Sequence, residues 1–148
     1  MGGFVKPITA MKKYIGKKKV NAIPMNRQEY NDFRGWKLPD DENGEDEGYL
    51  VEYVDGGKAN TPQYNGYVSW SPRDVFERAY KSIETPLDRL YIEYNELQDK
   101  YNKLVLFLGR KDAEKIAGEM QVALMEEQKL EMKAYLLTLR TRIELMKK

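Results

Sequence analysis

Residues 89–104, RLYIEYNELQDKYNKL, carry the side chains of this chain that are best suited to holding a ligand. Tyr94 and Tyr101 occupy positions of a helical repeat at which leucine stands elsewhere, and Asn95 directly follows Tyr94. Aromatic rings stack on nucleobases without selecting one base, and an asparagine amide both donates and accepts hydrogen bonds. The pattern suits a nucleotide-binding surface, although core tyrosines with their hydroxyls at the rim are the simpler interpretation.

Two clusters of basic residues are placed to serve an anionic ligand. Arg110 and Lys111 follow Gly109, where the first long helix is expected to end, and the free N–H groups that open the next helix favour phosphate. Arg140 and Arg142 lie near the end of the sequence. Charges that complement the helix dipole are the simpler interpretation of both clusters.

The spacing between the tyrosines and the last arginines bears on where a site could form. If the chain turns back near residue 110, Tyr94 lies beside about residue 127, and Arg142 extends beyond the first helix. We therefore expect Arg140 and Arg142 to meet Tyr94 only across a subunit interface.

The composition excludes most familiar enzyme mechanisms. The 148 residues include no cysteine and no histidine, which removes disulfides, thiol chemistry, Cys/His zinc sites and imidazole-based triads. The remaining acids and tyrosines form no catalytic constellation, so we expect no enzyme, no cofactor and no metal site. The net charge is +1, so no overall field favours nucleic acid, and no apolar run is long enough for a membrane span.

Two oppositely charged segments lie in the first half of the sequence. Residues 40–47 contain six acids, but they lack the Asp-x-Asp-x-Asp-Gly spacing of a calcium loop, so we expect a solvated loop. The first 20 residues contain six lysines and no acid. This tail could fold back on the acidic loop or contact a polyanion.

The periodicity of the sequence changes near residue 85, which predicts two domains, 1–84 and 85–148. In the first, residues 17–25, 48–54 and 65–71 read as strands bounded by Gly, Pro or Asn. Short helices are expected after Asn26, and after Ser71 with Pro72 as its first residue. This half is therefore predicted to be α+β, a small antiparallel sheet with short helices.

The second half is predicted to be an all-α helical hairpin or bundle that oligomerises. Thr85, Pro86 and Asp88 form a helix-start signature, and leucines and tyrosines follow at alternating spacings of three and four. From residue 116 onward the last helix has two apolar stripes, one through Met132 and another through Leu130. A single hairpin partner covers one stripe, so the second predicts association between copies, for which Met132→Lys is the natural test.

Two stretches resemble known phage proteins. MNRQEYNDFRGWKLPDDENGEDEGYLVEYVDGG followed by GYVSWSPRDVFERAY is similar to a module that precedes various short C-terminal domains in tailed-phage proteins, over about residues 13–80. LDRLYIEYNELQDKYNKLVLFL with EEQKLEMKAYLLTLRTRIEL resembles the helical phage family that includes the anti-CBASS cyclic-oligonucleotide sponges, over residues 87–146. The matching positions of the last helix are Gln128, Met132, Tyr135, Leu139, Arg142 and Ile143.

The second resemblance implies a hexameric, non-enzymatic protein in the host cytoplasm that captures cyclic di- or trinucleotides between subunits. Tyr94 would stack on a base, Asn95 would hydrogen-bond beside it, and Arg142 would come from a neighbouring chain. Gly109 stands where that family has a lysine, with Arg110 and Lys111 following. The alternative hypothesis is a phage adaptor that oligomerises through its helices and binds a host protein.

Overall fold

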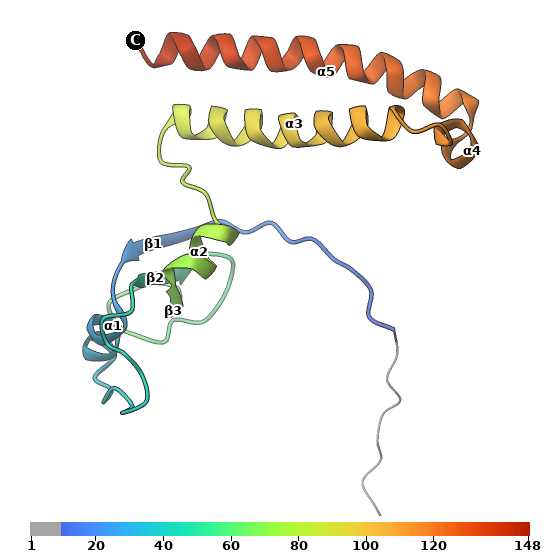
Figure 1. Ribbon diagram of the computed structural model, residues 1–148. Coiled ribbons are helices and arrows are strands. Elements are labelled where there is room, and N and C mark those ends of the chain that lie inside the picture. Colours follow the sequence, from blue (N-terminus) through green and yellow to red (C-terminus); the bar gives the residue numbers. More distant parts are fainter. Residues whose placement is uncertain (1–9) are drawn as a thin grey trace, which may run out of the picture. The chain divides into compact units, whose positions relative to one another are not determined.

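The computed structural model of the protein describes residues 10–148, which divide into two compact units between Ala79 and Tyr80 (Figure 1). The change in sequence periodicity places this division slightly later, after residue 84. The α+β fold class of the first part and the long helices of the second are confirmed.

The N-terminal unit is built on a three-stranded antiparallel sheet. The strands β1 (Val20–Pro24), β2 (Gly48–Tyr53) and β3 (Tyr67–Pro72) lie in the order β1-β2-β3, so all three predicted strands are confirmed. In the register of the sheet, Leu50 lies opposite both Ile23 and Trp70.

Two short helices complete the N-terminal unit. Helix α1 (Arg27–Arg34) begins at the predicted Asn26 cap, whose side chain accepts a hydrogen bond from the Glu29 N–H. This helix packs Tyr30 against Leu50 and Val68 of the sheet, and these three residues form the small core. Helix α1 ends at Gly35, which adopts the left-handed conformation with φ of 72°.

The second short helix departs from its predicted start. Helix α2 (Arg73–Ala79) begins after Pro72, so Ser71 is not its N-cap. Ser71 and Pro72 instead extend β3 and lie opposite Tyr49 and Gly48 of β2. A proline is tolerated there because it stands at the last position of an edge strand, where the missing N–H costs little.

The C-terminal unit consists of α3 (Pro86–Leu108), the single-turn α4 (Ala113–Ala117) and α5 (Glu119–Met146). Thr85 caps α3 as predicted, with its hydroxyl accepting from the Asp88 N–H at 3.0 Å. Figure 1 shows that α3 and α5 run side by side in opposite directions, joined by the break at residues 109–112 and by α4.

The hairpin buries one of the two apolar stripes of α5. The first stripe supplies the buried side chains of this helix, which are Met132, Leu136, Leu139 and Ile143. The second stripe stays open to solvent: Met120 is 81% exposed, and Leu130 and Leu137 are each 66% exposed. Within residues 10–148, no helix combines the length and apolar character that crossing a membrane requires.

Candidate functional site

Tyr94 lies on the inner face of the hairpin rather than on its surface. Its half-buried ring packs against the cluster formed by Leu90 of α3 with Leu139 and Ile143 of α5. The ring therefore contributes to the core of the hairpin, and only its outer part is available to a ligand.

A row of polar side chains continues from Tyr94 along α3. The Tyr94 hydroxyl lies 3.5 Å from Gln98 Oε1, and the Gln98 amide donates to Asn102 Oδ1 at 2.9 Å. The three residues stand four apart, so they follow one side of the helix. Gln98 was not among the residues selected from the sequence, although the four-residue spacing from Tyr94 to Asn102 is the signal that marks it.

Asn95 is exposed on α3, and so is Tyr91 one turn before it. Tyr91 keeps 38% of its surface in contact with solvent, which leaves its phenol ring accessible. The two residues present an aromatic ring and an amide beside the half-buried Tyr94. This surface can stack on a planar ring and hydrogen-bond to its edge.

The expected position of Tyr94 beside residue 127 is wrong. Tyr94 packs against the cluster that contains Leu139 and Ile143, so the last turns of α5 lie alongside the first turns of α3. The reason is the connection: residues 109–118, with α4 inside them, separate the two long helices and shift their pairing. Arg140 and Arg142 therefore flank the hairpin and do not extend beyond α3.

Arg142 is exposed and directly precedes the buried Ile143. Its place in the last turns of α5 puts it at the same level of the hairpin as the Tyr94 cluster. No polar contact joins Arg142 to Tyr94 or Asn95 within residues 10–148. The expectation that Arg142 meets Tyr94 only across a subunit interface therefore stays a prediction.

Arg110 and Lys111 lie in the break between α3 and α4, and only Lys111 has its charge available. Arg110 forms a two-pronged ion pair with Asp112, with distances of 2.9 Å from Nε and 3.0 Å from Nη2. This pairing raises the pKa of Arg110 and lowers that of Asp112. A phosphate bound by Arg110 would have to displace the Asp112 carboxylate, whereas exposed Lys111 has no ion pair within residues 10–148.

The candidate residues thus fall into two places. Tyr94, Asn95 and Arg142 lie at the level where α3 begins and α5 ends, while Arg110 and Lys111 lie at the connection between the helices. Within the part of the chain that the structure describes, no group of three His, Cys, Asp or Glu side chains could hold a metal ion.

The hairpin is also the part of the chain that matches a known family. The model of the Sequestin family matches residues 84–145, from just before α3 to the last turn of α5. The match covers less than half of the chain and does not reach the N-terminal unit, whose resemblance to a tailed-phage module stays a prediction. Neither the curated proteins nor the solved structures include a match to this chain.

Proposed function

We propose that the protein is a phage anti-defence sponge that binds a cyclic di- or trinucleotide signal in the host cytoplasm and does not cleave it. The observation that carries the proposal is the match of residues 84–145 to the Sequestin family, whose name denotes sequestration. A sponge needs a binding surface and no catalytic groups. In this proposal the binding surface is the part of α3 around Tyr94 and Asn95.

In this proposal the ligand lies at the end of the hairpin where α3 starts. A base stacks on the accessible part of Tyr94, Asn95 hydrogen-bonds to the base edge, and Arg142 pairs with a phosphate. Lys111 supplies a further cation from the opposite end of a second hairpin, and Arg110 joins it when a phosphate displaces Asp112. Such a site needs more than one copy of the chain.

The proposed assembly is a homo-oligomer, with six copies as the resemblance implies. Its support in the structure is the exposed stripe of α5, where Met120, Leu130 and Leu137 leave apolar surface in water. Large contiguous apolar surfaces on soluble proteins mark interaction sites. The open stripe is what a hairpin that associates with copies of itself would present.

The absence of chemistry on the ligand is also part of the proposal. Three carboxylates of the described chain, Glu52, Asp88 and Asp112, have pKa values lowered mainly by hydrogen bonds or ion-pair partners. A general acid at neutral pH needs a raised pKa, so these shifts have the opposite direction.

The test is a thermal-shift screen of the full-length protein against cyclic dinucleotides, cyclic trinucleotides and cyclic ADP-ribose isomers, with ATP as control. A ligand present at 100 times its Kd stabilises the folded state by about 2.7 kcal/mol, which gives a readable rise in Tm. The bound ligand is then released by heat and examined by chromatography. A sponge returns the cyclic nucleotide intact, whereas a linear product would identify an enzyme.

Variants assign the site. Asn95→Ala and Arg142→Ala should weaken binding by about ten- to a hundredfold without changing the Tm of the free protein, because both side chains are exposed. Lys100→Ala and Lys133→Ala are matched controls on the same two helices, and both should bind normally. Tyr94→Phe is preferred to alanine because it keeps the ring that packs on the core.

The adaptor hypothesis makes the opposite prediction. A wild-type protein that is oligomeric in solution and shows no shift with any cyclic nucleotide would refute the sponge. The same result would favour a protein that assembles through its helices and binds a host protein.

A further inference from the structure

The N-terminal unit contains one segment whose charges are all positive and another whose charges are all negative. Residues 1–19 contain six lysines, and the first acid of the chain is Glu29. Residues 40–47, by contrast, contain six acids and no base. The two segments therefore carry equal and opposite formal charge.

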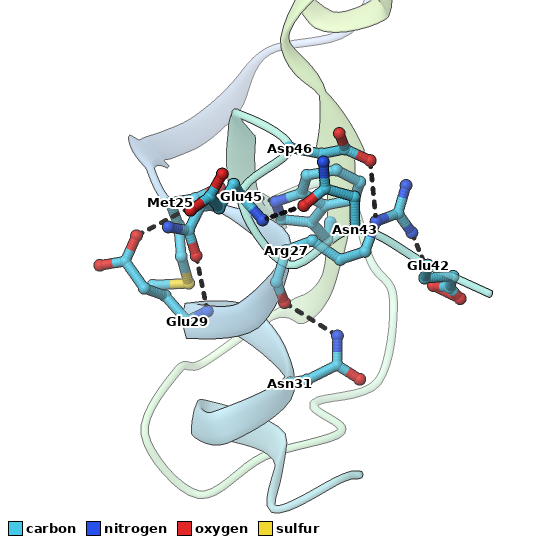
Figure 2. A network of polar contacts seen from close by, with 10 residues as sticks. Met25, Arg27, Glu29, Asn31, Glu42, Asn43, Glu45 and Asp46 are labelled. Carbon is cyan, nitrogen blue, oxygen red and sulfur yellow. Dashed lines mark hydrogen bonds and ion pairs between the residues drawn. The ribbon is translucent and has the colours of Figure 1, made fainter. Parts of the chain in front are cut away.

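Part of the acidic loop is already paired within the unit (Figure 2). Arg27 forms an ion pair with Glu42 at 2.8 Å and another with Asp46 at 3.5 Å, while Arg73 pairs with Glu47. The loop is still largely exposed to solvent, as expected, and three of its six acids form ion pairs.

The loop nevertheless keeps unneutralised charge. The carboxylates of Asp40 and Asp41 are exposed and have no cationic partner among residues 10–148. These two acids follow Pro39, which lines a neighbouring hollow, and Glu42 lines it after them. The unpaired acids thus stand at the edge of that hollow.

The hollow has a volume of about 410 Å³, and three of its eight lining residues are aromatic. Tyr30, Trp36 and Trp70 line it, and Trp36 keeps 52% of its surface exposed. Each indole ring already makes a cation–π contact with an arginine of the unit. The Arg27 guanidinium lies 4.5 Å from the centre of the Trp70 ring, and the Arg34 guanidinium lies 4.3 Å from the centre of the Trp36 ring. The aromatic surface therefore binds cationic groups within the unit itself.

An amide group also lines the hollow. Asn31 lines it and is only 8% exposed. Its amide nitrogen donates to the carbonyl of Arg27 at 2.8 Å, but its Oδ1 accepts no hydrogen bond from residues 10–148. This oxygen is not among the buried side-chain atoms that lack a partner, so solvent reaches it and it can accept a hydrogen bond from the N–H group of a ligand.

These features select one kind of ligand. Aromatic faces, an open amide oxygen and carboxylates all attract an ammonium or guanidinium group that carries N–H donors. Lys37 and Arg27 also line the hollow, and their charges offset part of the negative charge. The unpaired carboxylates of Asp40 and Asp41 disfavour a phosphate at this edge, so the hollow suits a cationic side chain better than a nucleotide.

A segment with such side chains is present in the chain itself. Residues 10–19 are exposed, with Met11, Tyr14 and Ile15 at 95%, 88% and 94%. Lys18 contacts Asp55 at 3.8 Å, whereas the lysines at 12, 13, 17 and 19 have no ion pair within the described residues.

The geometry of β1 indicates which copy of the tail fits. The tail joins β1 at Val20, whereas the hollow lies beyond the other end of that strand, where Trp70 bonds to the carbonyl of Met25. Residues 10–19 would have to turn back along β1 to reach the hollow of their own chain. The same residues of a second copy can place all their lysines at the hollow without such a turn. We propose that the acidic and aromatic hollow beside Trp36 binds the lysine segment 12–19 of a second copy of this chain.

The proposal is independent of nucleotide binding, and a peptide tests it. The receiver is the full-length chain with the four unpaired lysines neutralised: Lys12→Gln, Lys13→Gln, Lys17→Gln and Lys19→Gln. A fluorescent peptide of residues 10–20, AMKKYIGKKKV, is titrated and its anisotropy is measured at 50 mM salt. We expect saturable binding that is lost by 500 mM salt, and no binding of the same peptide with glutamine at every lysine.

Receiver variants locate the site. Adding Asp40→Asn and Asp41→Asn, or Trp36→Leu alone, should weaken binding about fivefold or more. Glu127→Gln with Glu131→Gln removes the same charge from α5 and should change nothing. The proposal would be overturned if the Asp40/Asp41 and Glu127/Glu131 variants lost peptide affinity equally. It would also be overturned if the glutamine peptide bound as tightly as the lysine peptide. Weaker peptide binding by the dilute wild-type chain than by the receiver would mean that a chain fills its own hollow, which would overturn the assignment to a second copy.

Discussion

The exposed stripe of α5 gives the sharpest test of self-association. Leu130 and Leu137 are each 66% exposed in a single copy, and they lie on the side of α5 opposite the buried Leu136 and Leu139. Full burial of a leucine stabilises by about 1.5–3 kcal/mol, so covering the exposed two thirds gives about 1–2 kcal/mol for each. Together they contribute about 2–4 kcal/mol per copy to an interface.

The perturbation is the pair Leu130→Lys and Leu137→Lys. It removes the apolar contribution and requires the interface to bury two charges, so association should weaken by at least about a hundredfold. Light scattering coupled to gel filtration, over a range of protein concentrations, measures the mass. Circular dichroism should show unchanged helix content, because neither leucine packs inside the hairpin.

The choice of residues matters to the interpretation. Met132→Lys, which the sequence alone suggests, places a charge on a side chain that is only 9% exposed within the hairpin. That variant would unfold the hairpin whether or not copies associate. Gln128→Lys is the matched control, since Gln128 is exposed and lies off the stripe. A wild-type protein that is monomeric at all concentrations, or an unchanged mass for the double variant, would refute the reasoning.

Three further predictions concern the stability of the hairpin. Leu139→Ala removes a side chain that is 1% exposed and should lower the free energy of unfolding by about 2–5 kcal/mol, measured by urea denaturation against exposed Thr138→Ala as control. Thr85→Ala removes the cap of α3 and should cost about 1 kcal/mol, with Thr85→Ser retaining most of the stability. Hydrogen bonds from Ser82 and the Thr85 N–H lower the pKa of Asp88 from its ordinary 3.8. Ionised Asp88 therefore stabilises the fold above pH 3.8, and this stabilisation is lost as the pH falls through the lower pKa of the folded state. The Tm of the wild-type protein should consequently fall more steeply in acid than the Tm of Asp88→Asn. Parallel curves of Tm against pH for the two proteins would contradict this prediction.

Local signals predicted the elements of this fold well. Asn26 with Glu29 and Thr85 with Asp88 are capping boxes, and both mark the observed helix starts because their hydrogen bonds lie within four residues of sequence. The prediction that Ser71 caps α2 was wrong for a non-local reason. Its place is decided by pairing with Tyr49 in β2, a partner more than twenty residues away.

The candidate site shows the same division between local and distant information. The tyrosine and asparagine positions on α3 follow from helical spacing, but the level of Arg142 depends on the length of chain used by α4. The sequence of residues 109–118 does not state how far α5 shifts along α3. The pairing of Arg110 with Asp112 was also missed, although the two residues are only two apart, because loop geometry decides which neighbour a guanidinium contacts.

The two stripes of α5 have a consequence for how this helix chooses its orientation. They lie on opposite sides, so half a rotation of α5 about its own axis would exchange the buried stripe for the exposed one. Gly118, with φ of 91°, joins α4 to α5 in a conformation that residues with side chains rarely adopt, and it thereby fixes the rotational phase at which α5 begins. Each helical residue added after Gly118 turns the rest of α5 by about 100°. Two added residues would turn Leu130 and Leu137 toward α3 and leave Leu139 and Ile143 in water. The length of this junction therefore determines which stripe of α5 packs inside the hairpin and which stripe stays exposed.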